Sequence, residues 1–129
     1  MLRNLVAAII AVNNYPISKA LDITSADRPL GWVNNGAMPP PNQPTAFEIK
    51  TQIMDSGYDR GDYVALLLGQ RMRACLDSIH QRDPLDFFSY IVESKEIATR
   101  ELPKLPGVGP KVAKNFIELQ FGHSTDAVA

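Results

Sequence analysis

Leu105-Pro106-Gly107-Val108-Gly109-Pro110-Lys111 is the stretch that decides the fold, and it lies near the C-terminal end of the chain. Two glycines one residue apart permit backbone conformations that a Cβ would block. Pro110 suits the first position of a new helix, where its missing N–H costs nothing. The stretch therefore predicts a tight turn that leads directly into a helix.

Apolar residues recur at helical spacing on both sides of this turn. Ahead of it, Ile97 and Leu102 indicate a short amphipathic helix. Behind it, the apolar positions are Val112, Ala113, Phe116, Ile117 and Phe121. Gly122 then suits the end of the second helix. We expect a helix, a hairpin turn and a helix over about residues 95 to 121.

Such a turn is expected to expose backbone N–H groups beside the positive end of the second helix. This arrangement favours an anion, for which we expect a phosphate of a nucleic-acid backbone. The residues expected to contact it are Pro106, Gly107, Val108, Gly109, Lys111 and Lys114. The alternative is a turn that only packs two helices together.

These residues resemble the helix-hairpin-helix motif of DNA-binding proteins, and most closely that of the endonuclease III-like DNA glycosylases. In that family the Leu-Pro-Gly-Val-Gly-x-Lys stretch is followed by an alanine, matched here by Ala113, and by a Phe-Gly pair. Phe121-Gly122 keeps the family's distance from Lys111. The resemblance covers about residues 97 to 128. It implies a helical barrel that binds duplex DNA and a role in DNA repair, specifically base-excision repair.

The resemblance also implies a catalytic role for Lys111. In bifunctional members of the family, the lysine at this position attacks the sugar C1′ of a flipped nucleotide. It forms a Schiff base, and the strand is then cleaved by elimination. Only a free amine can attack, so the lysine needs burial or nearby positive charge. A solvated lysine on a phosphate-binding turn is the alternative.

The family's catalytic aspartate has no counterpart at the aligned position. Counted from Lys111 without a gap, that position is Ala129, the last residue of the sequence. Asp126 lies shortly before it and replaces the aspartate only if the loop is rearranged. Two interpretations are therefore open: a truncated copy of a glycosylase, or a small non-catalytic relative that keeps the DNA-binding hairpin.

Composition is that of an ordinary globular protein. The 129 residues suffice for one domain with a modest core, and 45% of them are hydrophobic. The formal net charge of −1 differs from the strongly basic charge of many nucleic-acid-binding domains. The charge is uneven, because residues 95–114 alone carry a local charge of +3. Arg71 and Arg73, further upstream, are expected to be ordinary surface charges.

The single cysteine, Cys75, excludes an internal disulfide. It also excludes the four-cysteine iron–sulfur cluster of many endonuclease III-like proteins. Cys75 lies in an apolar helical pattern and is expected to be a buried hydrophobic residue. No set of His, Cys and carboxylate residues has metal-ligand spacing, so we expect no metal and no other cofactor.

The N-terminal segment contains an apolar run from Leu5 to Val12. This run is too short to span a bilayer, and the cleavage signature of a signal peptide is poor. We predict a central core helix over residues 2 to 14 and a cytoplasmic protein outside the membrane.

Helix-start patterns divide the middle of the chain. Thr45 and Glu48 have the spacing of a capping box and predict a helix to about residue 55. Asp62 is suited to cap a helix over residues 63–80. Asp83, followed by proline, is suited to cap the next helix.

Residues 24–45 are rich in proline and glycine and predict one long irregular loop. Trp32, Asn34 and Asn35 in this loop are candidates to stack on, and bond to, an extruded base. The alternative is that Trp32 pins the loop to the core.

The sequence therefore predicts an all-α fold of about six helices, arranged as a single domain of bundle or barrel type over residues 1–129. Three functions follow from it: a DNA-binding helix-hairpin-helix protein, an active glycosylase or abasic-site lyase using Lys111, and a helical protein-interaction module without DNA binding. An exposed apolar face would in addition favour a homodimer.

Overall fold

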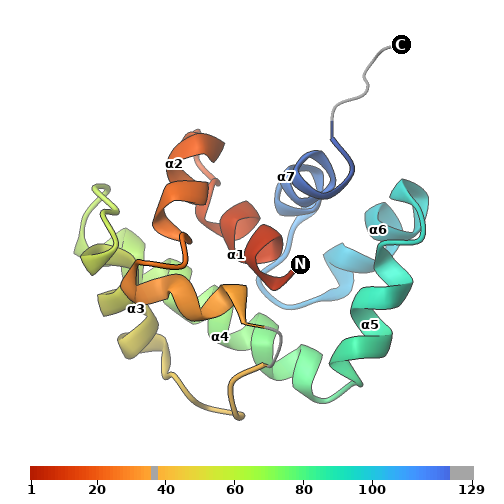
Figure 1. Ribbon diagram of the computed structural model, residues 1–129, viewed down its shortest axis with the longest axis horizontal. Coiled ribbons are helices and arrows are strands. Elements are labelled where there is room, and N and C mark those ends of the chain that lie inside the picture. Colours follow the sequence, from red (N-terminus) through yellow and green to blue (C-terminus); the bar gives the residue numbers. More distant parts are fainter. Residues whose placement is uncertain (36–37, 123–129) are drawn as a thin grey trace.

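The computed structural model of the chain describes residues 1–35 and 38–122, and all regular structure within these ranges is helical (Figure 1). The α-helices are α1 (Leu2–Ile10), α2 (Ile17–Ile23), α3 (Ala46–Asp55), α4 (Asp62–His80), α5 (Pro84–Ile91), α6 (Lys95–Glu101) and α7 (Pro110–Phe121). Two 3₁₀-helices are η1 (Pro29–Asn34) and η2 (Leu102–Lys104). The all-α class is confirmed. The described ranges hold seven α-helices rather than about six, because the segment after Pro16 forms a helix of its own.

Helix α1 lies at the centre of the fold. Seven of its nine residues are buried, and it contacts α2, α4, α7 and η1. Figure 1 shows α2 and α3 on one side of α1 and α5, α6 and α7 on the other, with the long helix α4 running below α1 from the side of α3 to that of α5. The apolar N-terminal run therefore forms the core helix that its composition predicts. Among the described helices, none is long and apolar enough to cross a membrane.

Helix α1 ends four residues before the predicted boundary at residue 14. Asn13 and Asn14 have positive φ angles of 58° and 63°, a left-handed conformation that asparagine adopts more readily than most residues. Arg60 donates through Nη1 to the carbonyl oxygen of Asn13 over 2.8 Å. The chain therefore turns at the two asparagines and begins α2 after Pro16.

Two of the three helix caps predicted in the middle of the chain are present. Thr45 Oγ1 accepts a hydrogen bond from the Glu48 N–H over 3.2 Å, and Glu48 Oε1 accepts one from the Thr45 N–H over 2.9 Å. Asp83 caps α5 in the predicted way. The prediction for Asp62 is wrong, because Asp62 is the first residue of α4 and the cap is Gly61, whose φ is 96°.

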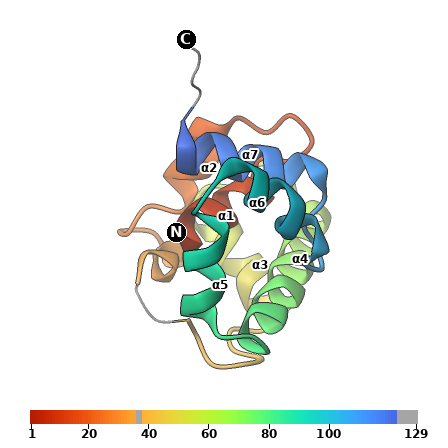
Figure 2. The ribbon, with the colours of Figure 1, turned by 90° about the vertical axis from the view of Figure 1, so that its right-hand side faces the viewer.

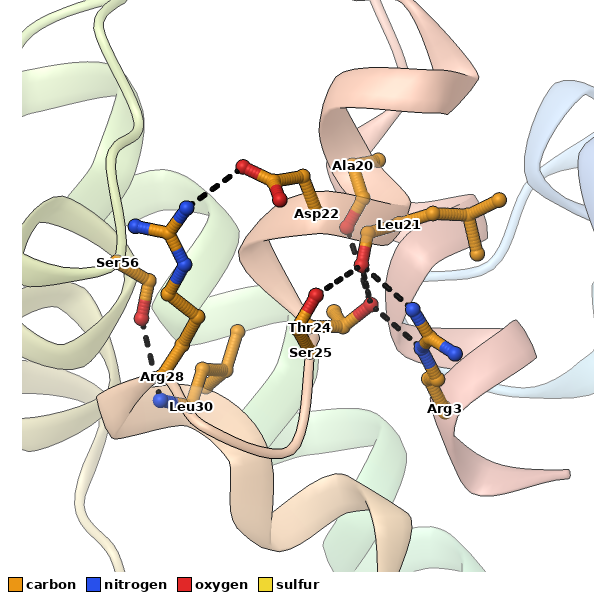
Figure 3. A network of polar contacts seen from close by, with 9 residues as sticks. All are labelled: Arg3, Ala20, Leu21, Asp22, Thr24, Ser25, Arg28, Leu30 and Ser56. Carbon is orange, nitrogen blue, oxygen red and sulfur yellow. Dashed lines mark hydrogen bonds and ion pairs between the residues drawn. The ribbon is translucent and has the colours of Figure 1, made fainter.

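The first part of the predicted loop over residues 24–45 is helical and packed (Figure 3). Arg3 on α1 donates through Nε to Thr24 Oγ1 over 3.2 Å. The Leu30 N–H, in η1, donates to Ser56 Oγ at the end of α3 over 3.1 Å. These bonds tie α1, α2, η1 and α3 together, so the prediction of one long irregular loop is wrong for this part.

The proline-rich part of the same stretch is held against α4. Arg73, only 8% exposed, donates through Nη1 to the Pro44 carbonyl oxygen over 2.8 Å. The same guanidinium pairs with Asp77 Oδ1 over 2.8 Å. His80 Nε2 contacts the carbonyl oxygen of Pro39. Arg73 is therefore a buried structural residue and not the surface charge that we expected.

Candidate nucleic-acid interface

The turn before α7 joins two helices in the order predicted for residues 95–121. Ser94 Oγ accepts from the Ile97 N–H over 3.1 Å and begins α6. After η2, the chain turns and enters α7 with Pro110 as its first residue. Gly122, with a φ of 80°, ends α7. Figure 2 shows α6 and α7 next to each other on one side of the molecule.

The two glycines of the turn have different roles. Gly107 has a φ of 79°, and a Cβ added to it would lie 2.7 Å from the carbonyl oxygen of Arg71 on α4. Gly109 has a φ of −97°, and a Cβ there would meet no atom within 4 Å. The expectation that a Cβ is blocked at both glycines therefore holds for Gly107 and is wrong for Gly109.

The residue between the glycines anchors the turn. Val108 is 4% exposed and Leu105 2%, so both side chains lie in the core. The Val108 N–H donates to the Leu105 carbonyl oxygen over 3.2 Å. Neither the side chain nor the amide of Val108 is therefore available to a ligand. The exposed Pro106 has no N–H to donate.

The remaining amides of the turn face no acceptor within residues 1–35 and 38–122. Gly107 and Gly109 are exposed, and no carbonyl or side chain of those ranges accepts from their N–H groups. The N–H of Lys111 lies in the first turn of α7, where helix geometry supplies no partner. Three donors without an acceptor among the described residues therefore lie beside the positive end of a twelve-residue helix.

Two lysines on α7 supply positive charge near the turn: Lys111 lines the same hollow as the two glycines, and Lys114 lines a neighbouring hollow beside α6. Lys111 and Lys114 are both exposed, and no described carboxylate lies within 4.0 Å of either Nζ. By contrast, Arg100 and Lys104 both pair with Glu101, over 2.9 Å and 3.2 Å. The hydrogen bonds from Arg100 and then Lys104 lower the pKa of the Glu101 carboxyl. The local charge counted from the sequence is therefore partly neutralised on α6 and η2 and persists on α7.

The tertiary fold adds one cation that sequence reasoning missed. Arg71 on α4 lines a hollow of about 410 Å³ together with Val12 and residues 107–112. Its side chain is exposed, and no carboxylate of the described ranges lies within 4.0 Å of its guanidinium nitrogens. Figure 2 shows the turn before α7 beside α4. Arg71 lies far upstream of the turn in sequence, so no local pattern connects the two.

Of the two residues expected to act in catalysis, the structure describes only Lys111. The Lys111 side chain is exposed, so it lacks the buried environment that favours a free amine. Asp126, the candidate replacement for the family aspartate, lies outside the described residues, as does Ala129. The geometry of Lys111 therefore fits a contact to phosphate more directly than it fits a nucleophile.

The candidates for contact with an extruded base are used mainly within the fold. Trp32 Nε1 donates to Gln52 Oε1 on α3 over 2.6 Å. Asn34 Nδ2 donates to the Thr24 carbonyl oxygen over 2.8 Å. Trp32 therefore pins η1 to α3, as the structural alternative predicts, and Asn35 remains exposed beside it.

The chain matches no protein-family model, no curated protein and no solved structure. Within the ranges that the structure describes, no three His, Cys, Asp or Glu residues gather closely enough to hold a metal ion. Cys75 is buried, and this burial raises the pKa of its thiol to about 12. The turn before α7, with its amides and cations, is therefore the site on which a functional assignment rests.

Proposed function

We propose that this chain binds duplex DNA through the phosphate backbone, with the turn before α7 as the contact. The observation that carries the proposal is the pair of exposed glycines, Gly107 and Gly109, whose N–H groups have no acceptor among the described residues, at the start of a twelve-residue helix. Amides in this position are suited to phosphate oxygens. Lys111 lines the same hollow as these amides, and Lys114 is a second exposed cation three residues further along α7. The resemblance to the endonuclease III-like glycosylases favours DNA as the source of the phosphate.

The proposed binding is weak and independent of base sequence. Phosphate contacts position a protein on the duplex and carry no sequence information. The whole chain has a net charge of −1, so no overall positive charge strengthens the contact. We expect a dissociation constant of about 10⁻⁴ to 10⁻⁶ M at physiological salt, with weaker binding as salt is added.

The experiment is a titration of a labelled duplex by fluorescence anisotropy at several salt concentrations. The test variant is Lys111→Ala with Lys114→Ala. The matched control is Lys19→Ala with Arg28→Ala, which removes the same charge from two exposed surface ion pairs near α2. Each lost phosphate contact reduces the slope of log K against log salt by about 0.9. We expect a reduction of about 1.8 for the hairpin variant and none for the control.

Three outcomes decide the proposal. A slope that falls only in the hairpin variant supports it. Equal loss in both variants shows that only net charge matters and overturns the assignment to the hairpin. Salt-independent or undetectable binding by the unchanged chain overturns DNA binding altogether, and then favours the protein-interaction module.

A relationship to base-excision repair is part of the proposal, whereas catalysis by Lys111 is not. The exposed Lys111 side chain gives the nucleophile no specific structural support. Reduction with borohydride in the presence of abasic-site DNA traps a Schiff base if one forms. A covalent adduct that disappears in Lys111→Arg would establish the lyase and extend the function beyond binding.

A further inference from the structure

We infer that Arg71 belongs to the same DNA-binding surface and contacts a second phosphate of the duplex. The inference rests on the proposed function of the turn before α7. It goes beyond that function, because it adds a second element, α4, and a residue with no sequence pattern that links it to the hairpin. The partner is the duplex backbone, recognised by a guanidinium group.

The position of Arg71 is fixed by close packing against the turn. An ideal Cβ on Gly107 would lie 2.7 Å from the Arg71 carbonyl oxygen and 3.1 Å from both its Cα and its Cβ. The Arg71 side chain therefore starts directly beside the turn. Both residues line the same hollow of about 410 Å³, which Lys111 also lines. Cations from two elements thus border one concave surface.

The neighbouring arginine on α4 shows that the exposure of Arg71 is not a general property of the helix. Residues two apart lie about 200° apart around an α-helix. Arg73 accordingly points away from Arg71, and it is buried against Asp77 and the Pro44 carbonyl oxygen. Arg71 is exposed and lacks a carboxylate partner within the described ranges. Its guanidinium is therefore available to an external anion.

The chemistry of the two groups is complementary. Backbone amides donate single hydrogen bonds to a phosphate oxygen, whereas the planar guanidinium fork binds two oxygens of one phosphate. With Arg71 on α4 and the amides on the turn, the surface holds the backbone at two points. Contacts at two points restrict the orientation of the duplex, whereas a contact at one helix start alone leaves the duplex free to rotate about it.

The test compares Arg71→Ala and Arg71→Lys with Arg82→Ala as the matched control. Arg82 lies beyond the C-terminal end of α4, about 14 Å or more along the helix from Arg71, and contacts Phe87. For Arg71→Ala we expect the salt slope to fall by about 0.9 and the affinity to fall about fivefold at 0.15 M salt. Arg71→Lys should keep the slope, because it keeps the charge, while Arg82→Ala should match the unchanged chain.

The outcomes separate this inference from the proposed function. If the Lys111 and Lys114 variant lowers the slope while Arg71→Ala leaves it unchanged, the inference is overturned and the hairpin contact stands. If Arg71→Ala and Arg71→Lys lower the slope equally, the effect does not follow the charge at position 71, and the inference is overturned too. If the unchanged chain does not bind DNA, the proposed function fails first. Helix content and urea unfolding of each variant identify any loss of fold.

Discussion

The side-chain amide of Asn115, on α7, donates a hydrogen bond to the carbonyl oxygen of Ala8, in the last turn of α1, over 3.2 Å. Carbonyl groups in the last turn of a helix have no partner within that helix. Asn115 is only 8% exposed, so the bond lies inside the core. The central helix and the helix that follows the hairpin are therefore joined by a buried polar contact as well as by apolar packing.

Replacement of Asn115 by alanine should lower the free energy of unfolding by about 1 to 3 kcal/mol, because it leaves the Ala8 carbonyl oxygen buried without its donor. The measurement is urea unfolding followed by circular dichroism. Gln120→Ala provides the control, since Gln120 also joins α7 to α1, through Asn4, but is half-buried and open to water. A loss as large in Gln120→Ala would show that burial of the Asn115 bond is not what matters.

Gly107→Ala should destabilise the protein by about 2 to 4 kcal/mol, from backbone strain at positive φ and from the overlap with Arg71. Gly109→Ala should change the free energy of unfolding by less than about 0.5 kcal/mol, because its Cβ meets open space. Thermal and urea unfolding of the two variants measure the difference. Similar losses in both would contradict the distinction between the glycines.

Cys75 should make the protein less stable at alkaline pH. The thiol titrates near its ordinary value of 9.0 in the unfolded chain and near 12 in the folded protein. As pH rises above about 9, only the unfolded chain releases the proton, so stability falls by about 1.4 kcal/mol per pH unit until about pH 12. Below pH 9 this contribution is constant.

The measurement compares the free energy of unfolding at pH 7 and pH 10 for the unchanged chain and for Cys75→Ala. Burial also raises the pKa of Tyr15 and Tyr58, but both tyrosines are present in both proteins. We expect the cost of the substitution to be smaller at pH 10 than at pH 7. A cost independent of pH would be inconsistent with a buried neutral thiol.

Thr45→Ala should lower the free energy of unfolding by about 1 kcal/mol, because it removes the side-chain acceptor of the capping box that begins α3. Thr51 offers a matched control in the same helix, since its exposed hydroxyl donates to the Phe47 carbonyl oxygen and caps no helix end. Thr51→Ala should have an effect of less than about 0.5 kcal/mol. If both threonines contribute equally, the cap is not the source of the stability.

The helix starts were predictable because a cap acts within one turn of chain. The Thr45 side chain bonds to a residue three positions away, so its pattern is visible in the sequence. Helix α7 begins at Pro110 and is terminated by Gly122. Both ends follow from the φ angles of these two residues, which depend on residue type more than on surroundings. The α1 boundary was missed, because two asparagines can either continue a helix or adopt a left-handed turn. Contact with Arg60 supports the turn here.

The candidate site was only partly predictable, again because a sequence pattern reports on residues that are close together in the chain. The glycine pair and the two lysines of the hairpin are adjacent in sequence, and they identify the turn and its cations. The pattern does not show that the Val108 amide is already bonded to Leu105, or that a Cβ is excluded at Gly107 alone. Both facts depend on how the turn is folded onto its neighbours.

By itself, therefore, the sequence determined the all-α class, a core helix at the N-terminus, the caps of α3 and α5 and the glycine turn before α7, because these follow from residues within about one helical turn of each other. Only the tertiary structure decided which arginine of α4 is buried and which borders the hairpin. Arg73 bonds to Pro44 and Arg71 packs against Gly107, and each pair is brought together by the folding of segments far apart in the chain. Such contacts depend on how helices pack, which no local pattern specifies.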